Sequence, residues 1–171
     1  DELIGLDPLL ATWIISAFAA VGALFAPHLS ATMPSPKFQF VLGNILCGFG
    51  LIFAAIPSIP ALGINDTVRK VLVAIALSFY MVLYPPLSGP GSFLTCIRLW
   101  QPKFIPLGMS CGSMLLNMWS FLGATIFPIM VQGISGGPDE DQKVGMSYSL
   151  LILGILSLVS AISVQLFARM Y

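Results

Sequence analysis

Long apolar runs separated by short polar stretches are the dominant pattern along this chain. Five runs are long enough to cross a membrane, because a helix rising 1.5 Å per residue needs about 20 residues to span the hydrocarbon core. They cover residues 8–26, 38–61, 71–100, 105–131 and 144–168. The connectors between them are rich in proline, glycine, asparagine and aspartate, which are typical of helix ends and turns. The pattern predicts an all-α fold, a polytopic membrane bundle of about five transmembrane helices in a single domain over residues 1–171.

The third run is unusually long and is interrupted by residues that break helices. These are Pro85, Pro86, Gly89, Pro90 and Gly91. Proline removes a backbone donor and bends a helix, so we interpret the run as one long, kinked and tilted helix. The alternative is a span that ends near Tyr84, followed by a re-entrant piece over residues 92–100.

Composition supports the membrane interpretation. Of 171 residues, 57% are hydrophobic and 8% are charged, whereas about 25% of the residues of a soluble domain are charged. A water-facing surface cannot be built from so few polar residues, so we expect an integral membrane protein whose partners are the lipid bilayer and other transmembrane helices or subunits. The net charge is zero and basic residues do not cluster, which argues against nucleic-acid binding.

Residues that could carry chemistry are sparse. The three cysteines lie in or near apolar runs and form neither a disulfide framework nor a metal-ligand pattern. The apolar runs contain no paired acids, no histidine cluster and no Ser-His arrangement. We therefore expect no enzymatic activity, no metal and no other cofactor.

The charges fall unevenly between the two sides of the membrane that five crossings define. All seven acidic residues lie on the side of the N-terminus, together with three basic residues. The opposite side has basic residues only: Lys37, Arg98, Lys103 and Arg169. Because lysine and arginine favour the inner side, we expect the N-terminus outside and the C-terminus inside, in a plasma or organellar membrane. The chain begins with Asp1 and not Met, so we expect either a processed protein or part of a longer one.

Polar and small residues within the runs suggest how the helices pack. A polar side chain in a membrane is costly without a partner, so we expect most of them to join helices through hydrogen bonds. They are Asn44, Ser78, Asn117, Ser120, Thr125, Ser147 and Ser149. Gly48, and the pair Gly108 and Gly112 at small-xxx-small spacing, are candidates for close helix packing.

One stretch combines, in order, a Gly-Pro pair, an aromatic residue with a following proline, and later Asn-Trp and Phe-Pro elements. Its residues are Gly89, Pro90, Gly91, Ser92, Phe93, Arg98, Trp100, Pro102, Gly108, Asn117, Trp119, Phe127 and Pro128. The stretch resembles the tenth and eleventh helices of sugar-porter-like members of the major facilitator superfamily. The five runs together resemble the last five helices of the C-terminal half of such a transporter. The resemblance implies transport of a small polar solute that binds between two halves of the protein.

Two positions depart from that family pattern. Between His28 and Lys37 the chain carries a single lysine, where the family has an Asp-Arg and Gly-Arg-Arg run. Arg98 stands where sugar porters place a glutamate, so these two cations would repel each other and would not hold a gate closed. Lys37 and Arg98 are our candidates for charges at the inner face. Arg98 reaches either the lipid headgroups or an acid on a partner chain.

Two hypotheses for function follow. The first is a major-facilitator-type transporter, of which this chain is the C-terminal portion, translocating a small solute together with an N-terminal half. Asn117 and Trp119, on the segment that resembles the eleventh helix, are then candidate substrate-side residues, together with Asn44. The second is a transporter-derived structural subunit of a large membrane complex, without transport activity of its own. The departures at the gate favour this second hypothesis.

Overall fold

The computed structural model describes residues 8–59, 62–137 and 142–167, and almost all of them are helical. The elements are α1 (Pro8–Thr32), α2 (Pro36–Ala55), the 3-10 turn η1 (Ile56–Ser58), α3 (Asp66–Leu83), the π-helical turn η3 (Tyr84–Ser88), α4 (Gly89–Leu99), the 3-10 turn η4 (Pro102–Phe104), α5 (Ile105–Ser135) and α6 (Gln142–Phe167). The described part of the chain contains no strand. The all-α helix bundle predicted from the sequence is confirmed.

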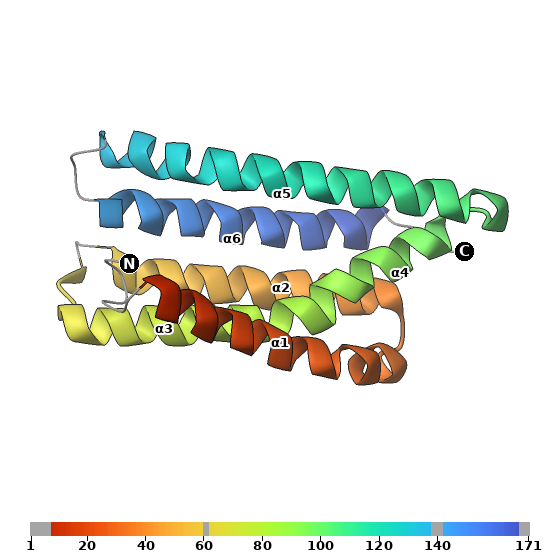
Figure 1. The fold of residues 1–171 in the computed structure, drawn as a ribbon, viewed down its shortest axis with the longest axis horizontal. Coiled ribbons are helices and arrows are strands. Elements are labelled where there is room, and N and C mark those ends of the chain that lie inside the picture. The colour runs from red at the N-terminus through yellow and green to blue at the C-terminus, as the bar shows by residue number, and fades with distance from the viewer. Residues whose placement is uncertain (1–7, 60–61, 138–141, 168–171) are drawn as a thin grey trace.

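The helices lie side by side along the long axis of the bundle. Helix α6 runs between α5 and α2, and α3 runs along another side of α2 (Figure 1). Helix α1 packs against α3 and η3. The end of α1, the start of α2 and the ends of α4 and α6 all lie at one end of the bundle (Figure 1).

Four helical segments of the described chain are long and apolar enough to cross a membrane. They are Trp13–Thr32, Pro36–Ser58, Thr67–Ser88 and Lys143–Leu166. Within α5, the described stretch Ser120–Ser135 is apolar but shorter, although α5 as a whole has 31 residues. A fifth crossing by α5 therefore stays a prediction.

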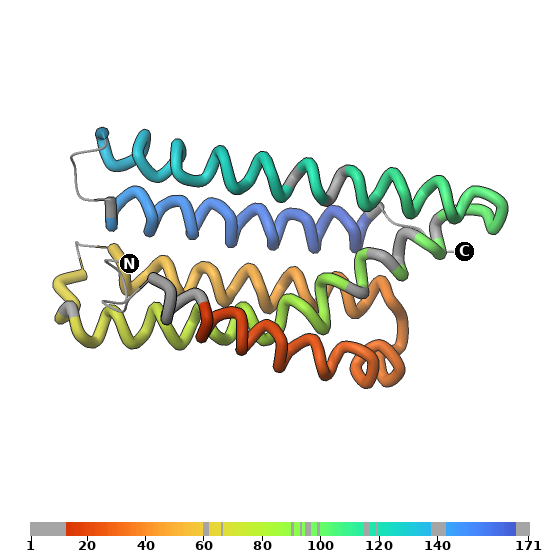
Figure 2. The backbone as a smooth tube through the Cα atoms, in the orientation of Figure 1, coloured from red at the N-terminus to blue at the C-terminus, as the bar shows by residue number. Residues whose placement is uncertain are grey.

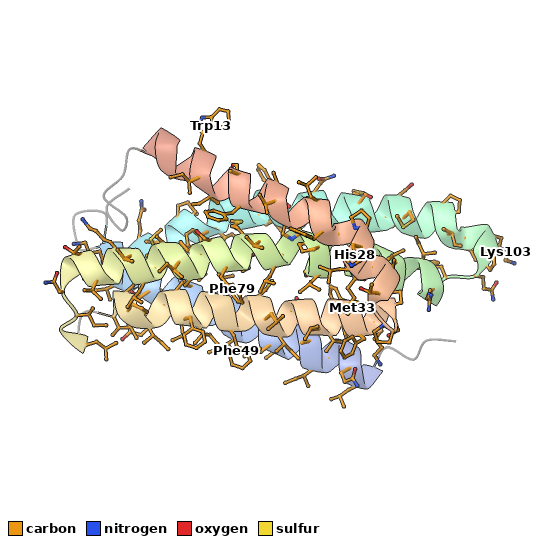
Figure 3. All side chains as sticks on the ribbon, turned by 90° about the horizontal axis from the view of Figure 1, so that it is seen from below. Trp13, His28, Met33, Phe49, Phe79 and Lys103 are labelled. Atoms are coloured by element: carbon orange, nitrogen blue, oxygen red, sulfur yellow. The ribbon has the colours of Figure 1, made fainter. Side chains whose placement is uncertain are left out.

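Helix α1 extends beyond the end that the apolar run suggested. Pro27 lies inside it, and the helix continues to Thr32. A proline removes one backbone donor, here the N–H that would bond to Ala23, and a membrane helix tolerates that loss. The Thr32 hydroxyl donates to the His28 carbonyl oxygen at 3.0 Å and lies 3.2 Å from the Leu29 carbonyl oxygen, within its own helix. Figure 3 places His28 toward the Lys103 end of the bundle, far from Trp13.

The third run is helical without a break from Asp66 to Leu99, but its middle turn is a π-helix. Pro85 and Pro86 have no N–H to give to the residues four positions earlier. The helical hydrogen bonds here reach back five residues and not four: the Gly89 N–H bonds to the Tyr84 carbonyl. The chain changes direction at this turn. After the turn, α4 runs obliquely past α2 toward the start of α5 (Figure 2).

Buried leucine and alanine side chains form the centre of the bundle. Leu51, Ala54 and Ala55 of α2 form a buried cluster with Leu150 of α6. The outer helices expose large apolar side chains, among them Leu24 of α1 at 79% and Phe121 of α5 at 71%. Such surfaces suit lipid or another apolar helix and not water.

Candidate functional site

A cavity with several polar groups in its lining lies between α2, α3 and α6. Its volume is about 280 Å³, and we call it the tyrosine cavity. Its lining residues are Asn44, Cys47, Leu51, Tyr80, Tyr84, Leu153 and Ser157. Four of these seven carry an amide or a hydroxyl, and they come from three separate helices and the η3 turn. A mostly apolar cavity with a few convergent polar groups is the usual form of a small-molecule site.

Asn44 and Ser157 join two walls of the tyrosine cavity. The Ser157 hydroxyl donates to the backbone carbonyl oxygen of Asn44 at 2.9 Å. It lies 3.4 Å from the side-chain oxygen Oδ1 of Asn44. The Asn44 side-chain nitrogen donates to the Phe40 carbonyl of its own helix at 2.9 Å. An amide oxygen can accept two hydrogen bonds. Among the described residues, Oδ1 has only the long contact with Ser157, so it retains capacity to accept a bond from a ligand hydroxyl.

Tyr80 and Tyr84 form the aromatic part of the same cavity. They are one helical turn apart, and their rings stack with centroids 5.8 Å apart and planes inclined by 28°. Tyr80 is half-buried, whereas Tyr84 is exposed. Tyrosine offers an apolar ring face and a hydroxyl at its edge. Tyr84 is also the first residue of the η3 turn: its N–H still bonds to the Tyr80 carbonyl of α3, and its carbonyl accepts the Gly89 N–H of the turn.

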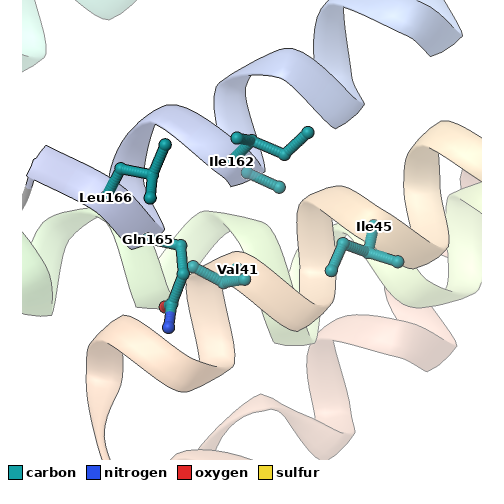
Figure 4. Close-up of a pocket in the computed structure, with 6 residues that line it drawn as sticks. Val41, Ile45, Ile162, Gln165 and Leu166 are labelled. Carbon is teal, nitrogen blue, oxygen red and sulfur yellow. The ribbon is translucent and has the colours of Figure 1, made fainter.

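Two other cavities lack such a combination. One, of about 170 Å³, lies between α2 and α6 and is lined by Val41, Ile45, Ala161, Ile162, Gln165 and Leu166 (Figure 4). Gln165 is the single polar residue in that lining. The other, of about 400 Å³ between α2 and α3, is lined by residues with apolar side chains and one glycine. Neither offers several polar groups to one ligand.

The structure separates Asn44 from Asn117, two of the three residues that the sequence suggested for the substrate side. Asn44 lines the tyrosine cavity. Asn117 is exposed on α5 and does not line it, and α6 stands between α5 and α2 (Figure 1). The side chain of Trp119 lies outside the described residues. A substrate-side role for Asn117 and Trp119 therefore stays a prediction.

The two candidate inner-face cations lie at the same end of the bundle. Lys37 Nζ donates to the Gln165 carbonyl oxygen at 3.0 Å, near the end of α6. Arg98 is exposed in the last turn of α4. Lys37 thus takes part in a contact between two helices of this chain.

The glycines chosen for close packing have different surroundings. A Cβ added to Gly48 would lie 3.0 Å from the Gly154 carbonyl oxygen, so α2 and α6 approach closely there. A Cβ at Gly108 would lie 2.9 Å from the Trp100 indole. At Gly112 an added Cβ would have no described neighbour within 4 Å. Close packing through Gly112 stays a prediction.

Two of the hydroxyls expected to join helices bond within their own helix. Thr125 donates to the Phe121 carbonyl at 3.0 Å, and Ser147 donates to the Lys143 carbonyl at 2.7 Å. Each acceptor lies four residues earlier, which is a common way for a helical hydroxyl to be satisfied. These two side chains therefore need no partner on a neighbouring helix.

Sequence reasoning missed four residues that the structure makes prominent. Tyr80, Tyr84 and Ser157 line the tyrosine cavity, and Gln39 is a buried glutamine near the start of α2. The signal for the tyrosines was their spacing of four residues in an apolar run. The signal for Gln39 was an amide at the second position of another such run. Within the described residues no group of three His, Cys, Asp or Glu could hold a metal ion.

The fold and the cavity define a class of protein: a polytopic α-helical membrane protein with a polar cavity between its helices. The chain belongs to the family described as Sugar (and other) transporter, whose model matches residues 3–169. The resemblance to sugar-porter-like transporters noted in the sequence is confirmed, and the protein is an integral membrane protein of a transporter family.

Individual relatives agree with this assignment. Glucose transporter 1E of Trypanosoma brucei brucei is 23% identical over 158 residues, which cover 92% of this chain and 30% of that protein. Membrane transporter D2 of Leishmania donovani is 22% identical over 163 residues, or 93% of this chain and 28% of that protein. Glucose transporter HT1 of Trypanosoma vivax is 24% identical over 156 residues, covering 91% and 28%. The chain thus spans less than a third of the length of these relatives. No solved structure matches the chain.

Proposed function

We propose that this chain forms the last five helices of the C-terminal half of a sugar-porter-type transporter and supplies part of the path of a neutral sugar. It works with an N-terminal half that completes the site. The tyrosine cavity is the observation that carries the proposal, because it collects uncharged hydrogen-bonding groups and two stacked aromatic rings between helices of a sugar transporter family member.

The chemistry of the cavity fits a sugar. A sugar ring presents hydroxyls around its edge and C–H groups on its faces. The amide of Asn44 and the hydroxyls of Ser157 and the tyrosines can exchange hydrogen bonds with the former, and the tyrosine rings can pack against the latter. The lining contains no charged side chain. A neutral solute is therefore favoured over an ionic one.

A general property of facilitators and one observation on this chain support the need for a second half. Facilitators bind their substrate between two halves and alternate access around the site. Here the outer helices α1 and α5 leave large apolar side chains uncovered, Leu24 and Phe121 among them. A second bundle and the lipid can share that surface. We infer that the isolated chain does not transport.

We further propose that the end of the bundle with Lys37 and Arg98 faces inward. Lys103 lies at the same end in Figure 3, and basic residues favour the inner side of a membrane. This places the end of α6 inside and the start of α1 outside.

The second candidate function is a transporter-derived structural subunit of a membrane complex. One observation favours it: Lys37 bonds to the backbone of α6 at 3.0 Å, so this cation holds two helices of one chain together. A gating cation would instead be released and captured during transport. If the chain is part of a transporter, hexose movement depends on the tyrosine cavity. If it is a structural subunit, hexose movement does not depend on that cavity.

The experiment that tests the proposal is a chimera. The chain replaces the matching segment of Trypanosoma brucei brucei glucose transporter 1E in cells that lack hexose uptake, and entry of labelled glucose is measured. We expect saturable uptake by the chimera and none by the chain alone. Tyr84→Ala should raise KM about tenfold, which corresponds to about 1.4 kcal/mol. Tyr148, an exposed tyrosine of α6 outside the cavity, gives the matched control Tyr148→Ala.

The outcomes separate the two functions. Uptake that is equally insensitive to Tyr84→Ala and Tyr148→Ala would contradict a sugar path through the tyrosine cavity. A chimera that reaches the membrane but moves no glucose would favour the structural subunit.

A further inference from the structure

Gln39 is the most deeply buried large polar side chain among the described residues, with 1% of its surface exposed. Its amide nitrogen donates to the Pro86 carbonyl oxygen at 2.7 Å and to the Ser30 hydroxyl at 2.9 Å. Pro86 belongs to the η3 turn and Ser30 to α1. One side-chain nitrogen of α2 thus connects two other elements, and we call this arrangement the Gln39 clamp.

The Pro86 carbonyl lacks the donor that an α-helix would give it. In an α-helix the carbonyl of residue 86 would accept the N–H of residue 90. Residue 90 is proline and has no N–H. A buried carbonyl without a partner costs free energy comparable to a lost hydrogen bond. Gln39 supplies the donor that Pro90 lacks.

Two glycines, Gly43 of α2 and Gly91 of α4, allow α2 to lie directly against the η3 turn and the start of α4. A Cβ at Gly43 would lie 2.8 Å from Leu87 Cβ and 2.9 Å from the Ser88 nitrogen. A Cβ at Gly91 would lie 2.9 Å from the Phe40 nitrogen. Backbone therefore meets backbone just beyond Pro86. The hydrogen bonds of Gln39 add a directional connection to this contact.

The clamped turn also begins with a residue of the candidate site. π-helical turns and clusters of proline and glycine are where helices bend. Tyr84 opens the η3 turn and lines the tyrosine cavity, two residues before the carbonyl that Gln39 holds. The Tyr84 carbonyl accepts the Gly89 N–H of the turn, so a change in the bend acts on Tyr84 through this bond.

We propose that Gln39 is a positioning residue: through the Pro86 carbonyl it holds the η3 turn in its bent form and so sets the place of Tyr84 in the tyrosine cavity. Without the clamp, α4 varies its direction relative to α3. The part that concerns Tyr84 rests on the proposed sugar path, whereas the part that concerns the bend needs no transport.

The test measures the bend in the full chain in lipid nanodiscs. Spin labels replace Val71 on α3 and Arg98 on α4, both exposed side chains, in a background where Cys47, Cys96 and Cys111 are alanine. In a straight helix these positions would be roughly 40 Å apart, within the range of double electron–electron resonance. Gln39→Met keeps the length of the side chain and removes the donor, so we expect a second distance population. Gln132→Met, at an exposed glutamine of α5, is the matched control and should leave one population.

A second background distinguishes the clamp from general packing. Pro90→Ala restores the N–H that an α-helix gives to the Pro86 carbonyl, so Gln39 is no longer needed. We expect Gln39→Met to add a population in the native background and none in the Pro90→Ala background, which is a coupling between the two sites. If Gln39→Met folds only together with Pro90→Ala, that result also supports the clamp.

Three results would overturn the clamp: an equal effect of Gln39→Met in both backgrounds, no effect in either, or misfolding in both. Glucose uptake is a separate readout. If Tyr84→Ala leaves uptake unchanged while the coupling between Gln39 and Pro90 is present, the proposed sugar path fails and the clamp stands. The reverse pattern removes the clamp alone.

Discussion

Gly48 of α2 and Gly154 of α6 lie backbone to backbone where the two helices cross. A Cβ added to Gly48 would lie 3.0 Å from the Gly154 carbonyl oxygen, and one added to Gly154 would lie 2.9 Å from the Gly48 carbonyl oxygen. Small residues allow membrane helices to approach this closely. The neighbours of these two glycines, Cys47 on α2 and Leu153 on α6, line the tyrosine cavity.

Replacing Gly48 by leucine should destabilise the bundle. The new side chain meets backbone on α6, which cannot move aside as the end of a flexible side chain can. We expect a loss of about 1–3 kcal/mol, as for other overpacked positions, and a lower melting temperature in detergent. Gly112→Leu is the matched control, because an added Cβ at Gly112 would have no described neighbour within 4 Å. Equal melting temperatures for the two variants would contradict the close crossing.

Ser157→Ala should weaken the same pair of helices by a smaller amount. The hydroxyl of Ser157 donates across the interface to the Asn44 carbonyl at 2.9 Å. Hydrogen bonds between membrane helices contribute about 0.6 kcal/mol on average. Ser163→Ala serves for comparison, since that hydroxyl donates to the Val159 carbonyl of its own helix at 2.8 Å. The melting temperature should fall for Ser157→Ala and stay unchanged for Ser163→Ala. A fall of the same size in both would remove the interhelical role of Ser157.

Much of the fold could be predicted from the apolar runs, because a membrane leaves a segment of this length few choices other than a helix. The ends were less predictable. The first apolar run was predicted to end at Ala26, yet α1 continues through Pro27 to Thr32, since a single missing N–H does not stop a membrane helix. The π-helical turn could not be foreseen in detail, because Pro85 and Pro86 indicate a bend without specifying which register replaces the lost hydrogen bonds.

The candidate site was only partly predictable. Asn44 could be singled out because an amide in an apolar run needs a partner, and it does line the tyrosine cavity. Tyr80 and Tyr84 were overlooked because tyrosine is as common in packing as in binding. Gln39 illustrates the wider difficulty. Its partner, the Pro86 carbonyl, is 47 residues away and is a backbone group. No side-chain pattern in the sequence marks such an acceptor.

Gly136→Ala should destabilise the end of α5. Gly136 has φ 92° and lies in the left-handed region, where its N–H bonds to the Gln132 carbonyl. A side chain in that conformation costs about 1–2 kcal/mol, so the melting temperature should fall. Gly133→Ala, one turn earlier in helical conformation and open surroundings, should instead leave stability unchanged or raise it by up to about 1 kcal/mol. Shifts of the same sign in both variants would argue against a left-handed helix end at Gly136.

Lys37→Met should loosen the contact between the start of α2 and the end of α6. Lys37 Nζ donates to the Gln165 carbonyl at 3.0 Å, and α6 ends at Phe167. The last carbonyls of a helix lack partners within it, and a cation near that end adds about 0.3–1 kcal/mol. Methionine keeps an apolar chain of similar length but removes the charge and the donor.

Lys103→Met is the matched control. The ammonium of Lys103 lies 4.9 Å from the ring of Phe104, the next residue in the chain, whereas that of Lys37 contacts another helix. We expect Lys37→Met to lower the melting temperature at low salt, by more than Lys103→Met does, and this difference to shrink at high salt as the charge is screened. A difference that does not depend on salt would show that Lys37 contributes through packing and not through its charge.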